Sequence, residues 1–211
     1  MMVTPLQLAR AFSAYANGGR LPNVRLVKGV LDVDGNVVSN RPTADFSSLP
    51  QVVSTDAASK IRRILADVPL RGTATSIKRV LPGTNTFEVP TWPVWNIFGK
   101  TGTSHISEGK AGYSKTRYNS TFIGGAPFEN PRIVIAMTLH EPDRAIAHYG
   151  GTVSAPAGAR IIGRTLAYMQ VSPSPEMAPP PPEIAAHLAN YQANVYHKPT
   201  PKAAASAKTG E

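Results

Sequence analysis

The first apolar residues of the chain recur at helical spacing and stop at a glycine pair. Thr4 can cap a helix whose first residue is Pro5, and Asn17-Gly18-Gly19 ends the pattern. The apolar face consists of Leu6, Ala9, Phe12 and Ala16. This pattern predicts a helix between Thr4 and Asn17.

The next part of the chain combines strand and helix patterns. Runs of β-branched residues on both sides of Asp34-Gly35 predict a strand, a tight turn and a second strand. A second helix is predicted to begin near Ser54-Thr55-Asp56 and to end before Pro69, because proline has no N–H to donate. Residues 71–74 are then predicted to be a loop.

The middle of the chain is predicted to form β structure. The candidate strands are residues 95–106, 118–126 and 132–140, and the last of these is an apolar run of strand length. Residues 107–116 are polar and contain glycine, and 129–131 have turn chemistry, so both segments are predicted to connect strands.

A final helix is predicted to begin at Ser154, with Ser154 as its cap, and to carry an apolar face. That face consists of Ile161, Ile162, Leu166 and Met169. After Gln170 the composition changes to Ser, Pro and Ala, with four prolines at 179–182. We therefore expect a globular domain over residues 1–170 and a flexible tail over residues 171–211.

Within the tail, residues 184–195 keep an apolar stripe at helical spacing. An isolated helix of that length is marginal in water, so we expect disorder there unless a partner binds.

The charge of the chain limits its function. The 211 residues carry 22 Lys and Arg against 13 Asp and Glu, a formal net charge of +9, and the whole excess lies in residues 1–170. A basic body favours anionic partners such as acidic wall polymers or carboxylate substrates. No Lys/Arg run with interleaved aromatic residues occurs, so nucleic acid is not expected as a partner.

The chain has no cysteine, which excludes disulfides and thiolate chemistry. No apolar run approaches the roughly 20 residues of a membrane-spanning helix.

The tripeptide Lys-Thr-Gly occurs twice, at Lys100-Thr101-Gly102 and at Lys208-Thr209-Gly210. About one chain in twenty of this length contains it by chance. The second copy lies in an alanine-rich context without β-branched residues, and we interpret it as such a coincidence. The first copy lies within an apolar, extended segment.

A strand through the first copy suits a particular chemistry. Thr101 and Thr103 would share one face of the strand, and Lys100 would lie on the other. Two hydroxyls near a positive charge suit a carboxylate ligand, and a backbone N–H at a strand edge can stabilise a developing oxyanion. K-T-G is the third motif of serine acyltransferases that bind penicillin, after S-x-x-K and S-D-N.

Several further motifs occur in the order of one known family. They are VTPLQLARAFSAYANGG, RGTATS, FGKTGTS, STFIGGAP, PRIVIAMTL and YGGTVSAPAGARIIGRTL. Over most of residues 3–170 the chain thus resembles the C-terminal portion of a class B, septal-type penicillin-binding protein transpeptidase domain. The expected fold is α+β, an antiparallel sheet edged by the Lys100 strand and packed with helices. This is the C-terminal half of the penicillin-binding, serine β-lactamase-like transpeptidase fold.

The resemblance implies roles for four residues. Lys100 would support the catalytic serine and the substrate carboxylate electrostatically. Thr101 and Thr103 would hold the terminal carboxylate of a D-Ala-D-Ala stem peptide or of a β-lactam, and the backbone N–H of Thr103 would be one arm of the oxyanion hole. Gly102 would leave room for the acyl group. No metal or organic cofactor is implied.

The nucleophile of the family lies upstream of the Thr-Pro-Leu-Gln helix, as does its S-x-N motif, so we expect neither in this sequence. Ser107-Glu108-Gly109-Lys110 fits S-x-x-K but lies in a polar loop, whereas the lysine must lie one helical turn from the serine to take its proton. Tyr15-Ala16-Asn17 imitates the second motif but is better interpreted as a helix C-terminus. We expect the chain alone to be inactive.

Other residues of catalytic type give weaker signals. Three histidines are scattered without metal-ligand spacing, namely His105, His140 and His148. Asp32 and Asp34 flank a turn. Trp92 and Trp95 are interpreted as core or cleft-wall aromatics rather than as a platform for nucleic-acid bases.

The expected function is that of a peptidoglycan D,D-transpeptidase acting at division, of which this chain is a C-terminal fragment. Its partners would be stem peptides and β-lactams, with cell-division proteins as a further class. The parent would act on the extracytoplasmic side of the bacterial inner membrane, held by an anchor upstream of this sequence. Two alternatives stay open. One is a serine D,D-carboxypeptidase or β-lactamase-like hydrolase, and the other is a non-catalytic remnant that binds wall or division proteins.

Overall fold

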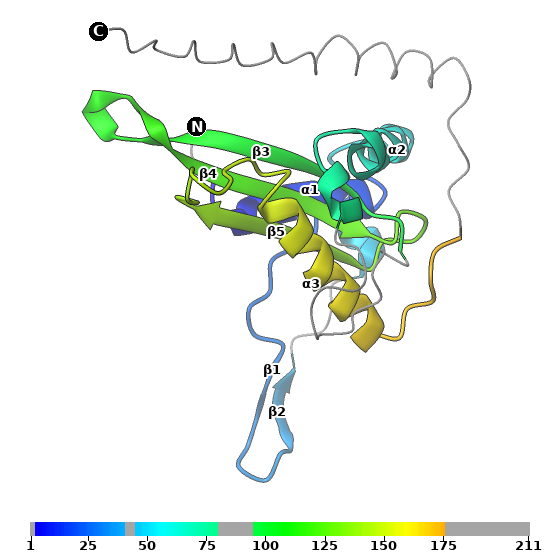
Figure 1. Cartoon of the computed structure of the whole chain (residues 1–211). Helices are drawn as coiled ribbons and strands as arrows, with labels where there is room; N and C mark the ends of the chain where they lie inside the picture. Colours follow the sequence, from blue (N-terminus) through cyan, green and yellow to red (C-terminus); the bar gives the residue numbers. More distant parts are fainter. Residues whose placement is uncertain (1–2, 41–44, 80–94, 176–211) are drawn as a thin grey trace, which may run out of the picture. The chain divides into compact units, whose positions relative to one another are not determined.

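The computed structural model describes residues 3–40, 45–79 and 95–175 (Figure 1). Trp92, the 184–195 stripe and the second Lys-Thr-Gly copy lie outside the described residues. Within the described ranges, no helix combines the length and apolar character needed to cross a membrane.

Helix α1, Pro5–Ala16, begins and ends where the sequence predicts. Thr4 Oγ1 accepts a hydrogen bond from the backbone N–H of Gln7, and the Gln7 side chain accepts one from the backbone N–H of Thr4. Beyond the C-cap at Asn17, the chain turns at Gly19 with a φ of +91°, a conformation that L side chains rarely adopt.

The predicted strand-turn-strand is confirmed as an antiparallel hairpin of β1, Gly29–Leu31, and β2, Val37–Asn40. In its turn, the side chain and the backbone N–H of Asn36 donate hydrogen bonds to the Asp32 carboxylate. These bonds favour the ionised form and lower the pKa of Asp32. Asp32 thus has a structural role in the turn.

Helix α2, Thr55–Arg71, is longer than predicted because it continues through Pro69. Ser54 Oγ caps it by accepting from the backbone N–H of Ala57. Pro69 lies in the last turn, where its missing N–H costs only the bond to the carbonyl four residues earlier, and its ring is buried. The predicted loop is therefore short, and the 3-10 helix η2, Thr75–Arg79, follows it.

The main sheet is antiparallel in the order β3-β4-β5, with the Lys100 strand at one edge as predicted (Figure 1). Its strands are β3, Phe98–Ser107; β4, Tyr113–Ala126; and β5, Ile133–His140. β3 begins later than predicted because the backbone of Asn96 bonds elsewhere: its N–H donates to Ser174 Oγ at 2.9 Å, and its carbonyl accepts from the N–H of Phe128 at 2.8 Å.

The prediction of a loop over residues 107–116 is wrong for half of that range, because Ser107 belongs to β3 and residues 113–116 belong to β4. β4 begins at Tyr113, which pairs with Ser107, so β3 and β4 form a long hairpin. The 3-10 turn η3, Gly109–Ala111, connects them, and the polar side chains of this segment are exposed except that of Ser114, which is buried.

Helix α3, Ser154–Tyr168, packs on the sheet face that carries Phe122. Ser154 is its first residue and not its cap, because its buried hydroxyl donates instead to the carbonyl of Ser120 at 2.7 Å. On the opposite face, Phe98 stacks on Phe12 of α1 with ring centroids 5.8 Å apart. The predicted α+β fold, a sheet packed with helices, is confirmed.

Candidate active site

Strand β3 presents the predicted site residues at the edge of the sheet. Thr101 pairs with Phe122 and Thr103 pairs with Ser120 on β4. Residues directly opposite in an antiparallel pair share a face, so both threonines lie on the Phe122 face and Lys100 on the other. The register confirms the arrangement expected from the sequence.

The two glycines of β3 differ in what they accommodate. A Cβ at Gly99 would collide with the Phe122 ring and with the carbonyl oxygen of Ile123. A Cβ at Gly102 would meet only the Cβ of Thr121, at an ordinary contact distance of 3.7 Å. Packing therefore requires glycine at position 99, whereas nothing around position 102 in the described chain does.

Two segments distant in sequence hold the threonine hydroxyls. The backbone N–H of Gly150 donates to Thr103 Oγ1 at 3.0 Å. The hydroxyl oxygens of Thr73 and Thr101 lie 2.5 Å apart and share a hydrogen bond. The candidate site is thus assembled from β3, the loop after α2 and the turn before α3.

The glycine pair Gly150-Gly151 allows this assembly. A Cβ at Gly150 would overlap the carbonyl oxygens of Gly102 and Thr121, and one at Gly151 would overlap the carbonyl oxygen of Thr73. Both glycines are buried. Side chains at these positions would push the two segments away from β3.

The Lys100 side chain leaves β3 from the face opposite the two threonines. The exposed side chain bends back, and Nζ donates to the carbonyl of Thr101 at 2.8 Å. The edge strand thus carries one positive charge and two hydroxyls, which are groups of the types that suit a carboxylate ligand.

The two sequence fragments that imitate other family motifs have local structural roles. Ser107 ends β3, and its Oγ accepts from the backbone N–H of Gly109 at 3.3 Å. Lys110 lies in the 3-10 turn η3, so these two residues are not one helical turn apart. Asn17 is the C-cap of α1. Neither fragment has the geometry of its motif.

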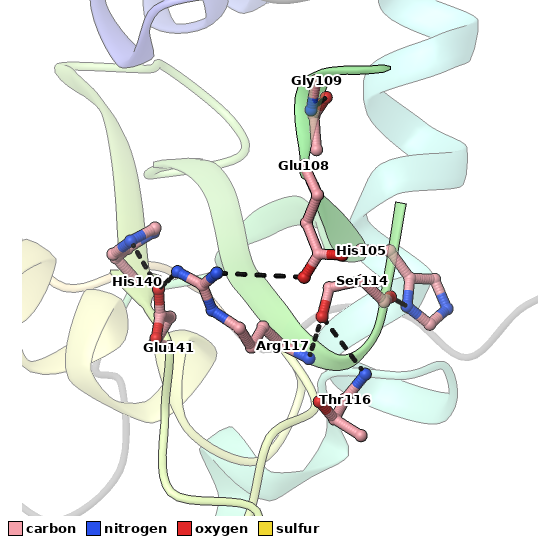
Figure 2. A network of polar contacts seen from close by, with 9 residues as sticks. His105, Glu108, Gly109, Ser114, Thr116, Arg117, His140 and Glu141 are labelled. Atoms are coloured by element: carbon pink, nitrogen blue, oxygen red, sulfur yellow. Dashed lines mark hydrogen bonds and ion pairs between the residues drawn. The ribbon is translucent and has the colours of Figure 1, made fainter. Parts of the chain in front are cut away.

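A polar network joins the far end of the β3–β4 hairpin to the end of β5 (Figure 2). The Arg117 guanidinium donates to Glu141 and lies 3.9 Å from the Glu108 carboxylate, and His140 lies 3.2 Å from Glu141. The hydrogen bond from Arg117 is the main reason that the pKa of Glu141 is lowered, and it raises the pKa of Arg117.

The ion pair between Arg117 and Glu141 makes the stability of the folded chain depend on pH. The pKa of Glu141 is lower in the folded protein than the ordinary value of 4.5, so the pair contributes fully above that pH and loses its contribution as pH falls through the folded-state pKa. We expect Glu141→Gln to be less stable than the parent at pH 7. In urea titrations the difference should vanish below the folded-state pKa. A difference that stays constant down to pH 2 would contradict this assignment.

Four rings form a row of tilted contacts that begins on β3. Centroid distances are 4.6 Å from His105 to Tyr118, 4.7 Å from Tyr118 to His148 and 4.2 Å from His148 to Tyr149. The row begins two residues after Thr103, on the same strand face, and ends next to Gly150. Two of the scattered histidines thus pack against tyrosine rings, and His105 Nδ1 also lies 2.6 Å from the carbonyl of Ser114.

Sequence reasoning missed Thr73, Gly150 and Gly151 as site residues. Their segments, RGTATS and YGGT, carried part of the family resemblance, so a signal was present. No local pattern connects them with Thr101 and Thr103, however, because the contacts span 28 and 47 residues.

The family model described as the penicillin binding protein transpeptidase domain matches residues 1–163. Among curated proteins, the chain is 32% identical over 174 residues to stage V sporulation protein D of Bacillus subtilis, covering 81% of this chain and 24% of that protein. It is 28% identical over 175 residues to the probable peptidoglycan D,D-transpeptidase PenA of Neisseria flavescens, covering 82% of this chain and 36% of that protein. The chain therefore spans about a quarter to a third of these relatives.

Solved structures show the same likeness. Penicillin-binding protein 3 of Mycobacterium tuberculosis, complexed with ampicillin, matches with a TM-score of 0.64 and 29% identity over 84% of this chain and 37% of that one. The apo transpeptidase domain of penicillin-binding protein 3 from Burkholderia pseudomallei matches with a TM-score of 0.59 and 30% identity. The match covers 82% of this chain and 45% of that one.

Proposed function

Because the chain belongs to the penicillin-binding protein transpeptidase family, we propose that it supplies the substrate-binding edge of a serine D,D-transpeptidase that cross-links peptidoglycan. The observation that carries this proposal is the pair of hydroxyls of Thr101 and Thr103, held by Thr73 and Gly150 on the edge strand that also carries Lys100. The nucleophilic serine would come from sequence outside these 211 residues, so the chain alone would not form an acyl-enzyme.

The geometry supports a role for each residue. Thr103 Oγ1 already accepts the Gly150 N–H, so its own proton is free to bind the terminal carboxylate of a D-Ala-D-Ala stem peptide or of a β-lactam. Lys100 would add electrostatic attraction to that carboxylate, and the backbone N–H of Thr103 would stabilise the oxyanion. Gly102 would leave space for the acyl group.

The reaction would proceed in two acyl transfers. The serine oxygen attacks the carbonyl between the two D-alanines, an ester forms, and the terminal D-alanine leaves with the proton taken from the serine. The amine of a neighbouring stem peptide then attacks the ester and releases the serine.

The polypeptide that performs these steps would act outside the cytoplasmic membrane, with division proteins as partners. We place its transpeptidase portion at residues 1–170 and its tail at 171–211.

Fluorescent penicillin tests this function. The purified 211-residue chain should not be labelled covalently. We also expect labelling of a chimera of Mycobacterium tuberculosis penicillin-binding protein 3. In this chimera, residues 3–170 of the present chain replace the matching segment. Labelling of the chain alone would contradict the proposed origin of the serine, with Ser107 the first residue to test. A folded chimera that is never labelled would contradict the proposed function.

The glycines of β3 allow a matched comparison. We expect Gly102→Ala to leave the thermal midpoint of the 211-residue chain unchanged and to slow penicillin acylation of the chimera about tenfold or more, because the added methyl would occupy ligand space. Gly99→Ala should lower the thermal midpoint, because its methyl would collide with the Phe122 ring. Equal losses of stability in both variants would contradict the role given to Gly102.

A further inference from the structure

Thr73 contributes the third hydroxyl at the edge of β3. It lies in the loop between α2 and η2, is exposed, and pairs directly with Thr101. The proposed function assigns nothing to it. Its position raises the question of what the hydroxyl pair does when a carboxylate binds.

A threonine hydroxyl has one proton to donate and lone pairs that accept. If Thr101 donates to Thr73, its oxygen offers only lone pairs to a ligand and repels a carboxylate. If Thr73 donates to Thr101, the Thr101 proton is free for the ligand. The Thr103 hydroxyl is likewise free to donate its proton, since its oxygen accepts the Gly150 N–H.

The loop that carries Thr73 is fixed independently of the Thr73 side chain. The backbone N–H groups of Gly72 and Ala74 donate to the carbonyl of Val68 at 3.0 and 3.2 Å, and Ala74 is fully buried. The Ser76 hydroxyl donates to the carbonyl of Gly151. The Thr73 hydroxyl is thus presented to Thr101 by a backbone that its replacement should not move.

We propose that Thr73 is a positioning residue, which donates its proton to Thr101 and so directs the Thr101 hydroxyl toward the substrate carboxylate. This inference rests on the proposed function, because it concerns the same carboxylate. Hydrogen bonds in such a chain polarise one another, so the effect on an anionic ligand should exceed that on a neutral one.

The test compares an acid with its amide on the full 211-residue chain. N-acetyl-D-alanyl-D-alanine and its C-terminal amide are titrated while the backbone amide signals of residues 100–103 are followed by NMR. The parent chain should bind the acid more tightly than the amide. Thr73→Val should reduce that preference about tenfold, and Thr73→Ser should restore it. Thr75→Val, the same change two residues further on, should behave as the parent.

Combining variants separates positioning from direct contact. If Thr73 acts through Thr101, the double variant Thr73→Val/Thr101→Val should show the same preference as Thr101→Val alone. An additive loss would overturn the inference, as would an unchanged preference in Thr73→Val. Absence of any preference in the parent chain would contradict the proposed function itself, and this inference with it.

Discussion

Thr103→Ala should slow penicillin acylation of the chimera about 100-fold, the expected cost of removing one hydrogen bond to a charged group and leaving a buried donor without its partner. The hydroxyl is the acceptor of the Gly150 N–H, and Gly150 is buried against the backbone of Gly102 and Thr121. The substitution therefore removes the proposed contact to the ligand carboxylate and also the hydrogen bond that holds the turn before α3 against β3.

The measurement is the second-order rate constant for ampicillin acylation. Thr103→Ser keeps the hydroxyl and should retain most of the rate. Thr138→Ala, the same change on an exposed position of β5, should match the parent chimera. A rate for Thr103→Ala within a factor of two of the parent would exclude Thr103 from the carboxylate site.

Phe122→Ala should destabilise the 211-residue chain by about 3–5 kcal/mol, the range for deleting a fully buried aromatic ring. Phe122 has no exposed surface, and three glycines approach its ring so closely that a Cβ on any of them would collide with it. They are Gly99, Gly124 and Gly158. The ring therefore fills the space between β3, β4 and α3, and its loss leaves a cavity that neighbouring side chains cannot fill.

Urea denaturation of the two chains measures this difference. Phe46→Ala removes the same ring from a position that is 55% exposed and should change the free energy of unfolding little. A loss below about 1 kcal/mol for Phe122→Ala would show that the sheet and α3 do not pack as described.

The elements predicted well are those whose signals are local. The start of α1 follows from Thr4 and Pro5, whose capping and fixed φ act within one turn. β5 follows from an apolar run bounded by turn residues. The position of the Lys100 strand at the sheet edge followed from the family resemblance, and the register confirms it.

The features missed depend on distant parts of the chain. Pro69 remains inside α2 because its buried ring packs in the last helical turn, where one lost hydrogen bond is tolerated. β4 extends back to Tyr113 because Tyr113 pairs with Ser107, across a register shift after the pair His105–Tyr118. Thr73 and Gly150 reach β3 only through the tertiary fold, so the sequence indicated the threonines as candidate site residues but not the groups that contact their hydroxyls.

The most direct test of the account is the fate of the acyl group. The chimera is incubated with a stem peptide ending in D-Ala-D-Ala and with an added amine acceptor such as glycine, and the products are separated by mass. We expect release of D-alanine together with a peptide joined to the amine, and loss of both products in Lys100→Ala and Thr103→Ala. Release of D-alanine with the hydrolysed peptide as the sole product would contradict the account and identify a carboxypeptidase.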